Sequence, residues 1–296
     1  MLQEKGSPSP VTKRSDRLRS LARRLLPAGV RKLLREARRE LPVRARDLPA
    51  DLREALIRAE DRLPPARLRR RVGLTSSRAE FLEVGERAAA DVLRVYRAAA
   101  PAGGGFGAWL DFGCGSGRVL RHLRRAGVAD LSGVDVDRGA IRWLQRRHGR
   151  ESFVRSPERP PLPFPGESFD VVVAVSVFSH LDEPVQLEWL EESARLLRPG
   201  GLLIATTHGP DLLVTRDDLT ADQLERFAAT GFLFAPGGGP FNEASAFHSA
   251  EYLKKTWGSR LDPVVALPRG LGGYQDLSVW RRPAASEVGQ APRAPE

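Results

Sequence analysis

A glycine-rich loop in the first half of the chain constrains the fold more than any other sequence feature. Residues 109–118 read WLDFGCGSGR, so a strand-like run is followed by Gly113, Gly115 and Gly117 and then by a helical pattern. Glycine lets the backbone bend sharply and approach a ligand, because no Cβ stands in the way. The loop opens onto a helix N-terminus, whose free N–H groups favour a carboxylate or phosphate.

A carboxylate at the end of the next strand-like run limits the class of ligand that the loop can bind. Asp135 lies 18 residues after Gly117, where it can accept hydrogen bonds from both hydroxyls of a ribose. The pair of features predicts a nucleoside-bearing ligand. A dinucleotide fingerprint that starts at Gly113 needs glycine at position 118, and this chain has Arg118. No G-x-x-x-x-G-K-[ST] run occurs, which excludes a P-loop.

Strand-like runs alternate with helical patterns beyond residue 106, which predicts a doubly wound α/β sheet. The run 171–175 is apolar on both faces, as a central parallel strand requires. The connection 268–275 is too short for a helical crossover, so the last two strands should pair antiparallel. The predicted strands are 107–112, 131–136, 152–155, 170–177, 202–207, 263–267 and 276–280, with helices at 80–99, 117–126, 138–147 and 183–197.

Composition and charge divide the chain into segments. Residues 1–75 hold 21 Lys and Arg against 9 Asp and Glu, whereas the rest holds 26 against 28, so the net charge of +10 comes from the N-terminal segment. We expect residues 1–15 to be disordered, 16–75 to form a basic helical segment, and 76–282 to form the α/β domain. Within that domain, 209–250 is a lid-like insertion with one helical piece, LTADQLERFAAT (219–230), and then a loop, APGGGPFNEASAFHS (235–249). Beyond the domain, we expect 283–296 to form a disordered tail.

Cysteine usage and apolar runs indicate where the protein works. Cys114 is the single cysteine, so no intramolecular disulfide or cysteine-rich metal site is possible. With 41% apolar and 28% charged residues, the composition is that of a soluble globular protein. No run resembles a signal peptide or a membrane span. The sequence therefore predicts a cytoplasmic protein.

The ordered set of motifs resembles the class I S-adenosylmethionine-dependent methyltransferases. The set begins with D-x-G-x-G-x-G and an acidic residue on the second strand. It continues with PLPFPGESFDVVVAVSVFSHL (161–181), which looks like the family's fourth-strand signature, and with LLRPGGLLIATTHG (196–209) and GYQDLSVWRR (273–282). The resemblance covers residues 76–282. It implies a Rossmann-like seven-stranded sheet with an antiparallel last strand, and S-adenosylmethionine as cofactor.

The resemblance also implies which residues hold that cofactor. Asp111, Gly113, Gly115 and Gly117 would cradle the methionine part, and Asp135 would hold the ribose. The sequence departs from the family before its LPF turn, where many members place an aspartate and Glu158 is the stand-in. The remaining expected contacts, to the adenine and the methyl-donor pocket, are Val136, Asp137, Ser156, Pro157, Glu158 and Ser176.

Two histidines follow predicted strands and are candidate catalytic residues. His180 comes after the fourth strand and is the leading candidate base, because an imidazole accepts a proton at neutral pH. The alternative is a histidine that only orders its loop. His208 follows the fifth strand and is the second candidate. Methyl transfer from a sulfonium demands no metal.

The acceptor and the partners are less constrained by the sequence. The fourth-strand end lacks [DNS]-P-P-[YFW], and no Pro-Cys pair occurs, which argues against base methylation in DNA. A small-molecule acceptor methylated on O or N is favoured, and the motifs resemble bacterial members of broad substrate range. Candidate acceptor contacts are Phe241, His248, Tyr252 and Gln275.

Two alternatives use the basic N-terminal segment. One is a nucleic-acid methyltransferase that grips phosphates with this segment, although interleaved aromatic residues and a known binding module are missing from it. The other is attachment of a protein of methyltransferase fold to an anionic membrane or partner. A solvated charged face remains the third reading of the segment, and the oligomeric state stays open.

Overall fold

The computed structural model describes residues 63–73, 77–101, 103–149, 152–236 and 244–284. The chain divides into two compact units between Ile57 and Arg58, and every described residue belongs to the second unit. The predictions for residues 1–15, for the helical patterns before Leu63 and for the tail beyond residue 284 lie outside the described residues. Within those residues, no helix is long and apolar enough to cross a membrane.

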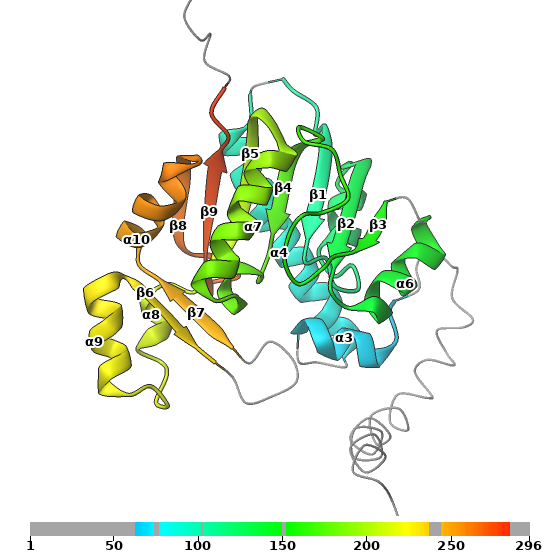
Figure 1. Cartoon of the computed structure of the whole chain (residues 1–296). Helices are drawn as coiled ribbons and strands as arrows, with labels where there is room; N and C mark the ends of the chain where they lie inside the picture. Colours follow the sequence, from blue (N-terminus) through cyan, green and yellow to red (C-terminus); the bar gives the residue numbers. More distant parts are fainter. Residues whose placement is uncertain (1–62, 74–76, 102, 150–151, 237–243, 285–296) are drawn as a thin grey trace, which may run out of the picture. The chain divides into compact units, whose positions relative to one another are not determined.

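Seven strands form one sheet in the order β3-β2-β1-β4-β5-β9-β8 (Figure 1). Strands β1 to β5 pair in parallel, and β9 pairs antiparallel with both β5 and β8. The predicted strand number, the doubly wound parallel part and the antiparallel last strand are therefore confirmed. The bounds are β1 Ala108–Phe112, β2 Asp130–Asp135, β3 Phe153–Arg155, β4 Phe169–Ala174, β5 Leu197–Thr207, β8 Asp262–Leu271 and β9 Gln275–Arg281.

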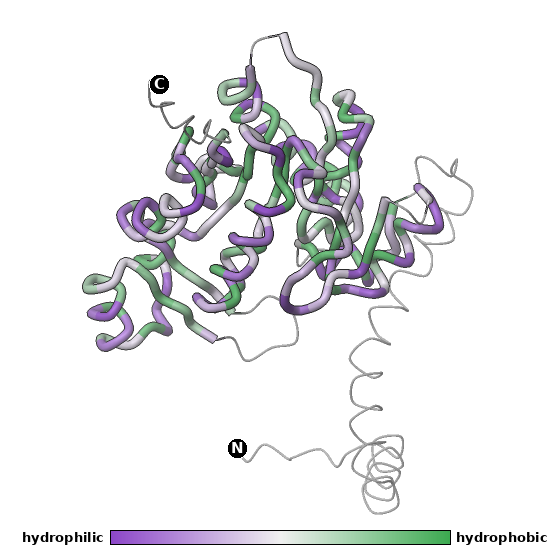
Figure 2. Tube along the Cα trace, turned by 45° about the horizontal axis from the view of Figure 1, so that its top comes forward, coloured by the Kyte–Doolittle hydropathy of each residue, from purple (hydrophilic) through white to green (hydrophobic). Residues whose placement is uncertain are grey.

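Helices cover both faces of this sheet, because successive residues of the central strand β4 are apolar and point alternately to the two faces. On β4, Val171 and Val173 join one buried cluster, and Val172 and Ala174 join the other. Figure 2 shows apolar residues along the strands and mixed polarity along the helices. The first cluster holds α4 (Arg78–Ala99), α5 (Leu120–Arg125) and α6 (Arg138–His148), and the second holds α7 (Glu183–Leu196) and α10 (Ala250–Thr256).

The fourth strand is shorter than its apolar run predicts. The run extends to Val177, but β4 ends at Ala174, and a 3-10 turn η2 (Phe178–His180) follows. Ser176 adopts φ +56°, a left-handed conformation that is rare for residues other than glycine. Its N–H donates to Thr206 Oγ1 at 2.8 Å, so the neighbouring strand holds this backbone in place.

The insertion after β5 contains more regular structure than the sequence indicates. The predicted helical piece is present as α9 (Ala221–Thr230), with Thr220 and Gln223 forming a capping box. The segment predicted as a loop contributes a strand to a small hairpin, and Phe247 bridges to His208 at the end of β5. The hairpin strands are β6 (Phe232–Ala235) and β7 (Ser245–His248); α8 (Pro210–Leu213) and η3 (Trp257–Ser259) complete this region.

One buried carboxylate ties the loop before β4 to α7. Glu192 is 5% exposed, accepts the Leu162 N–H at 2.7 Å and pairs with Arg195 at 2.7 Å. Burial raises the pKa of Glu192, but the hydrogen bonds from Arg195 and Leu162 lower it by more, so the net pKa is below its usual value. The ionised form therefore stabilises the fold.

We expect Glu192→Ala to lower the free energy of unfolding by about 2–3 kcal/mol at pH 7, because a buried charged acceptor is lost. The pKa of Glu192 is lower in the folded than in the unfolded protein. The contribution of its charge to stability is therefore complete above the unfolded pKa and is lost as the pH falls through the folded pKa. Urea unfolding at several pH values measures this. Glu191→Ala is the matched control, since Glu191 is exposed and its pair with Arg260 contributes at most about 1 kcal/mol. Equal losses in the two variants would contradict the role of Glu192.

Candidate functional site

A cavity of about 610 Å³ lies at the carboxyl ends of β1, β2 and β4. Open α/β sheets bind ligands at this edge, where the strand order reverses. Most of the cofactor-binding residues expected from the sequence line it. These are Gly113, Gly115, Asp135, Val136, Asp137, Ser156, Pro157, Glu158 and Ser176, together with the candidate base His180.

The glycine loop forms one wall of the cavity through backbone conformations that only glycine adopts without strain. Gly113 has φ +77° and Gly115 has φ +51°. A Cβ on Gly113 would collide with Val177, and a Cβ on Gly115 would collide with Val72. Gly117 also has a positive φ but does not line the cavity. The loop is therefore packed tightly against Val72 and Val177, and its backbone forms the cavity wall without side chains.

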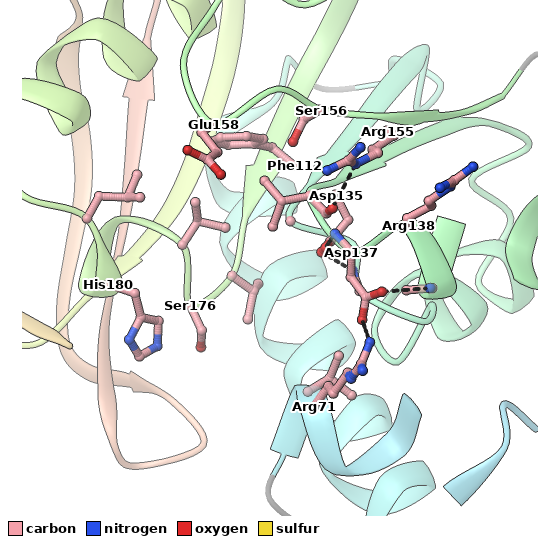
Figure 3. A pocket seen from close by; sticks show the side chains of 18 of the residues that line it. Arg71, Phe112, Asp135, Asp137, Arg138, Arg155, Ser156, Glu158, Ser176 and His180 are labelled. Atoms are coloured by element: carbon pink, nitrogen blue, oxygen red, sulfur yellow. Dashed lines mark hydrogen bonds and ion pairs between the residues drawn. The ribbon is translucent and has the colours of Figure 1, made fainter. Parts of the chain in front are cut away.

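Asp135 connects this loop to the second strand. Its Oδ2 accepts the Gly115 N–H at 2.7 Å, and its Oδ1 accepts the Asp137 N–H at 2.7 Å. Burial raises the pKa of Asp135, and these two hydrogen bonds oppose the rise. Each carboxylate oxygen has a second lone pair, so the group can still accept hydrogen bonds from a ligand. Figure 3 shows Asp135 beside Asp137 on the side of the cavity opposite Ser176 and His180.

Asp111 lies beneath the cavity and does not line it. The residue is 3% exposed, and its Oδ2 has no hydrogen-bond partner within the described part of the chain. The pKa of Asp111 is raised to about 7, because burial and the charge of Asp135 raise it by more than Arg118 lowers it. An unsatisfied buried acceptor of this kind is suited to a cationic group or a donor.

Arginines line the nucleoside side of the cavity, and the sequence reasoning did not identify them. Arg71 comes from α3 (Ala66–Gly73) and pairs with Asp137 at 2.7 Å, whereas Arg155 donates from Nε to the Val136 carbonyl at 3.2 Å. Arg118 and Arg138 also line the cavity. Figure 3 shows Arg71 approaching from below on α3. Arg71 was counted with the basic N-terminal segment, and no local signal marks it as a ligand-facing residue.

Asp137 has two structural tasks besides lining the cavity. Its Oδ1 accepts the N–H groups of Gly139 and Ala140 and caps α6. Its Oδ2 receives Arg71. The residue therefore links α3, the end of β2 and the start of α6.

A buried polar network extends behind Ser176 and His180. Gln275, at the start of β9, is 4% exposed, and its Oε1 accepts the hydroxyls of Ser176 (2.8 Å) and Thr206 (2.9 Å). Its Nε2 lies 3.1 Å from His208 Nε2. The rings of His180 and His208 are 5.7 Å apart and nearly perpendicular. Of these residues, Ser176 and His180 line the cavity; Gln275 and His208 do not.

The other expected acceptor contacts do not line the cavity. His248 Nε2 lies 2.9 Å from Gln186 Oε1, and burial lowers the pKa of His248 to about 3. The Tyr252 hydroxyl donates to Glu183 at 2.7 Å. Both side chains pack between the insertion and α7, so contact with an acceptor stays a prediction for them. Phe241 lies outside the described residues.

Residues 110–205 match the family model for the methyltransferase domain. Over 104 residues the chain is 40% identical to the phthiotriol/phenolphthiotriol dimycocerosates methyltransferase 1 of Mycobacterium ulcerans, covering 34% of this chain and 37% of that protein. Over 101 residues it is 36% identical to the ubiquinone biosynthesis O-methyltransferase of Ruegeria pomeroyi, covering 33% and 40%. The matches thus span about two fifths or less of the relatives' own length.

A solved structure is also similar in part. The 1,6-didemethyltoxoflavin-N1-methyltransferase of Burkholderia thailandensis has a TM-score of 0.47 at 17% identity, covering 67% of this chain and 78% of that one. The match to the family model contains the glycine loop, Asp135, β4 and most of β5. Residues 110–205 of this chain therefore match a methyltransferase domain, in agreement with the resemblance seen in the motifs.

Proposed function

We propose that the protein transfers a methyl group from S-adenosylmethionine to an oxygen or nitrogen of a small-molecule acceptor. One observation carries the proposal: Asp135 and the Gly113–Gly115 cradle face a single cavity that His180 also lines. A nucleoside site and a candidate base thereby share one space. The relatives are named for phthiotriol dimycocerosates, ubiquinone biosynthesis and fatty acids, which favours a small-molecule acceptor.

The residues present fit this cofactor. The glycine loop presents its backbone to the cavity without a side chain in between, and Asp135 keeps lone pairs for ribose hydroxyls. Glu158 and Ser156 line the part of the cavity assigned to the adenine. Asp111 Oδ2, which has no partner among the described residues, lies behind the glycine loop and would attract the positively charged ammonium group of the methionine part. When bound, S-adenosylmethionine supplies a methyl group on a positively charged sulfur, ready for in-line displacement.

The protein's own contribution is alignment of the acceptor and removal of its proton. His180 Nδ1 lies 2.7 Å from the Ala244 carbonyl oxygen, which can only accept, so the proton of the neutral ring is on Nδ1. Nε2 then carries the lone pair. Burial lowers the pKa of His180 below its usual value, and the bond to Ala244 opposes this effect. The ring is therefore neutral near pH 7 and can act as a base.

The proposal extends to the domain limits and the location. Residues 76–282 form the catalytic domain, and α3 belongs functionally with it because Leu68, Arg71 and Val72 line the cavity. The cytoplasm is the proposed location, supported by the single, buried Cys114. The basic segment 16–75 keeps the roles expected from its sequence: a grip on nucleic-acid phosphates, contact with an anionic membrane or partner, or a solvated face.

We expect Asp135→Ala to weaken S-adenosylmethionine binding at least about tenfold, because two ribose hydrogen bonds are lost at about 1 kcal/mol each. Isothermal titration calorimetry measures the affinity, and circular dichroism checks the fold, since Gly115 and Asp137 also lose their acceptor. Asp130→Ala is the matched control at the opposite end of the same strand and should bind as wild type. Unchanged affinity in Asp135→Ala would remove the ribose assignment.

Turnover should fall about 10²-fold in His180→Ala while cofactor affinity is retained, because proton removal is lost but the cofactor contacts are not. In the wild type, turnover should decrease as the pH falls through the lowered pKa of His180, below about 6.5, because the protonated ring no longer accepts a proton. Rates with a labelled methyl donor give both results. His148→Ala serves as control, since His148 lies on the far end of α6. A loss of less than about threefold would leave His180 only an ordering role.

A further inference from the structure

The two helices beside the nucleoside end of the cavity carry positive charge without any negative charge. Helix α3 reads ARLRRRVG and α6 reads RGAIRWLQRRH, so together they hold eight arginines and no carboxylate. Exposed helix faces commonly mix both signs, because neighbouring like charges repel one another. Each helix therefore presents positive charge that its own residues do not neutralise. Although α3 lies within the basic segment 16–75, α6 lies outside it.

The exposed arginines of α6 form one stripe along the helix. Arg138, Arg142 and Arg146 are four residues apart, so they lie on the same side and span about 12 Å. Ile141 and Leu144, on the other side, are buried in the core. All three arginines are exposed, and within the described part of the chain none of them makes an ion pair or a side-chain hydrogen bond. Their guanidinium groups are therefore available to a partner.

Helix α3 adds two more exposed arginines next to this stripe. Gly139 lies in the first turn of α6, and a Cβ on it would be 3.5 Å from Leu68 and 3.8 Å from Arg71 Nη1, so the two helices are in contact (Figure 1). Arg67 and Arg70 are exposed, and they too have no ion pair among the residues that the structure describes. The arginine face consists of these two residues and the stripe: Arg67, Arg70, Arg138, Arg142 and Arg146.

Positive charge continues from the end of α6 onto the neighbouring helix α5. His148 is the last residue of α6, and its Nδ1 lies 3.1 Å from Arg124 Nη1 of α5. The pKa of this histidine is lowered to about 4, by burial first and then by the charges of Arg124, Arg147 and Arg121. Nearby like charges disfavour the charged imidazole, so the contribution of the arginines indicates a positive potential at this end of α6.

We propose that the arginine face holds the protein at an anionic lipid surface, through contacts between its guanidinium groups and lipid phosphates. The inference goes beyond the proposed function, because it concerns attachment and not methyl transfer. Guanidinium groups bind phosphates through two parallel N–H donors, and clusters of about four to eight basic residues on a helix are attracted to anionic lipid. Arg138 belongs both to the face and to the cavity lining (Figure 3), so attachment places the nucleoside end of the cavity beside the lipid.

The composition of the two helices favours lipid over nucleic acid. Binding of single strands uses exposed aromatic rings for base stacking, and Trp143, the only Phe, Tyr or Trp of the two helices, is buried beneath Arg147. Gln145 is their only amide side chain, and it donates to the Phe153 carbonyl at 2.8 Å instead of facing a base edge. Charge without stacking or amide readout suits a continuous layer of phosphates.

Sedimentation with vesicles tests the inference on the full-length protein, without cofactor or acceptor. The vesicles consist of phosphatidylcholine alone or of phosphatidylcholine mixed with phosphatidylglycerol. We expect the wild type to sediment with the mixed vesicles and not with the neutral ones. The bound fraction should fall as the salt concentration rises from about 50 mM to about 0.5 M, because salt screens the charges. Absence of wild-type binding to the mixed vesicles overturns the proposal.

Two double variants test the face itself. One combines Arg142→Gln with Arg146→Gln on α6, and the other combines Arg67→Gln with Arg70→Gln on α3. None of these four residues lines the cavity. From the usual contribution of a basic residue near an anionic surface, each double variant should bind the mixed vesicles at least about tenfold more weakly, and the fourfold variant at least about 10²-fold. Circular dichroism checks that the variants fold.

The matched control removes the same charge elsewhere. Arg97 on α4 and Arg226 on α9 are exposed and also have no ion pair among the described residues. The variant that combines Arg97→Gln with Arg226→Gln should bind the mixed vesicles as the wild type does. Equal weakening in this control and in the double variants would show that net charge alone decides, which contradicts a role for the face. Unchanged binding in the fourfold variant would place the attachment elsewhere in the chain and contradict it too.

Nucleic acid is tested in the same buffer with double-stranded DNA and single-stranded RNA of unrelated sequence, by fluorescence anisotropy. Binding to either that is tighter than binding to the vesicles, and that is lost in the fourfold variant, overturns the assignment to lipid. Calorimetry with S-adenosylmethionine keeps this test separate from the proposed function. A protein that sediments with anionic vesicles but binds no S-adenosylmethionine keeps the inference and loses the proposed function.

Discussion

The hydrogen bonds of the Asp135 carboxylate are the constraint on which the rest of the site depends. One oxygen holds the Gly115 N–H and the other holds the Asp137 N–H, so the glycine loop, the end of β2 and the start of α6 share one anchor. The anchor is partly buried, and its burial is tolerated because backbone donors satisfy it. Asp137, fixed by the same carboxylate, then receives Arg71 and caps α6. Cofactor site and fold are thus supported by the same bonds.

A second constraint acts on the opposite side of the cavity. Ser176 takes a left-handed backbone conformation at the end of β4, which costs about 1–3 kcal/mol in an isolated chain. Thr206 and Gln275 compensate through hydrogen bonds to its N–H and hydroxyl. The sharp turn at Ser176 directs the chain into η2 and places His180 at the cavity. The left-handed turn at Ser176 therefore both ends β4 and determines where His180 lies.

The sequence predicted the sheet well, because its signals are local. Glycines at 113, 115 and 117, an acidic residue at the end of the next strand, and short apolar runs separated by helical patterns are readable within short windows. The hairpin of the insertion was not predicted, since its strands have four residues each and are stabilised by contacts with β5 and α8 that lie far away in sequence. Arg71, Gln275 as a network centre and the unpartnered Asp111 Oδ2 depend on three-dimensional proximity, and no pattern in the chain marks them.

The helix α3 contributes to the site although it lies outside the sheet and its covering helices. The sheet and its covering helices are complete from α4 onward, but Val72 lies against Gly115 and Arg71 reaches Asp137. Part of the cavity wall is therefore made by a segment that contributes no strand. Positions 72 and 115 compete for the same space: a side chain at 115 is accommodated only if the side chain at 72 becomes smaller or α3 moves away. In this protein the size of the ligand space can change through a helix outside the sheet, while every strand stays as it is.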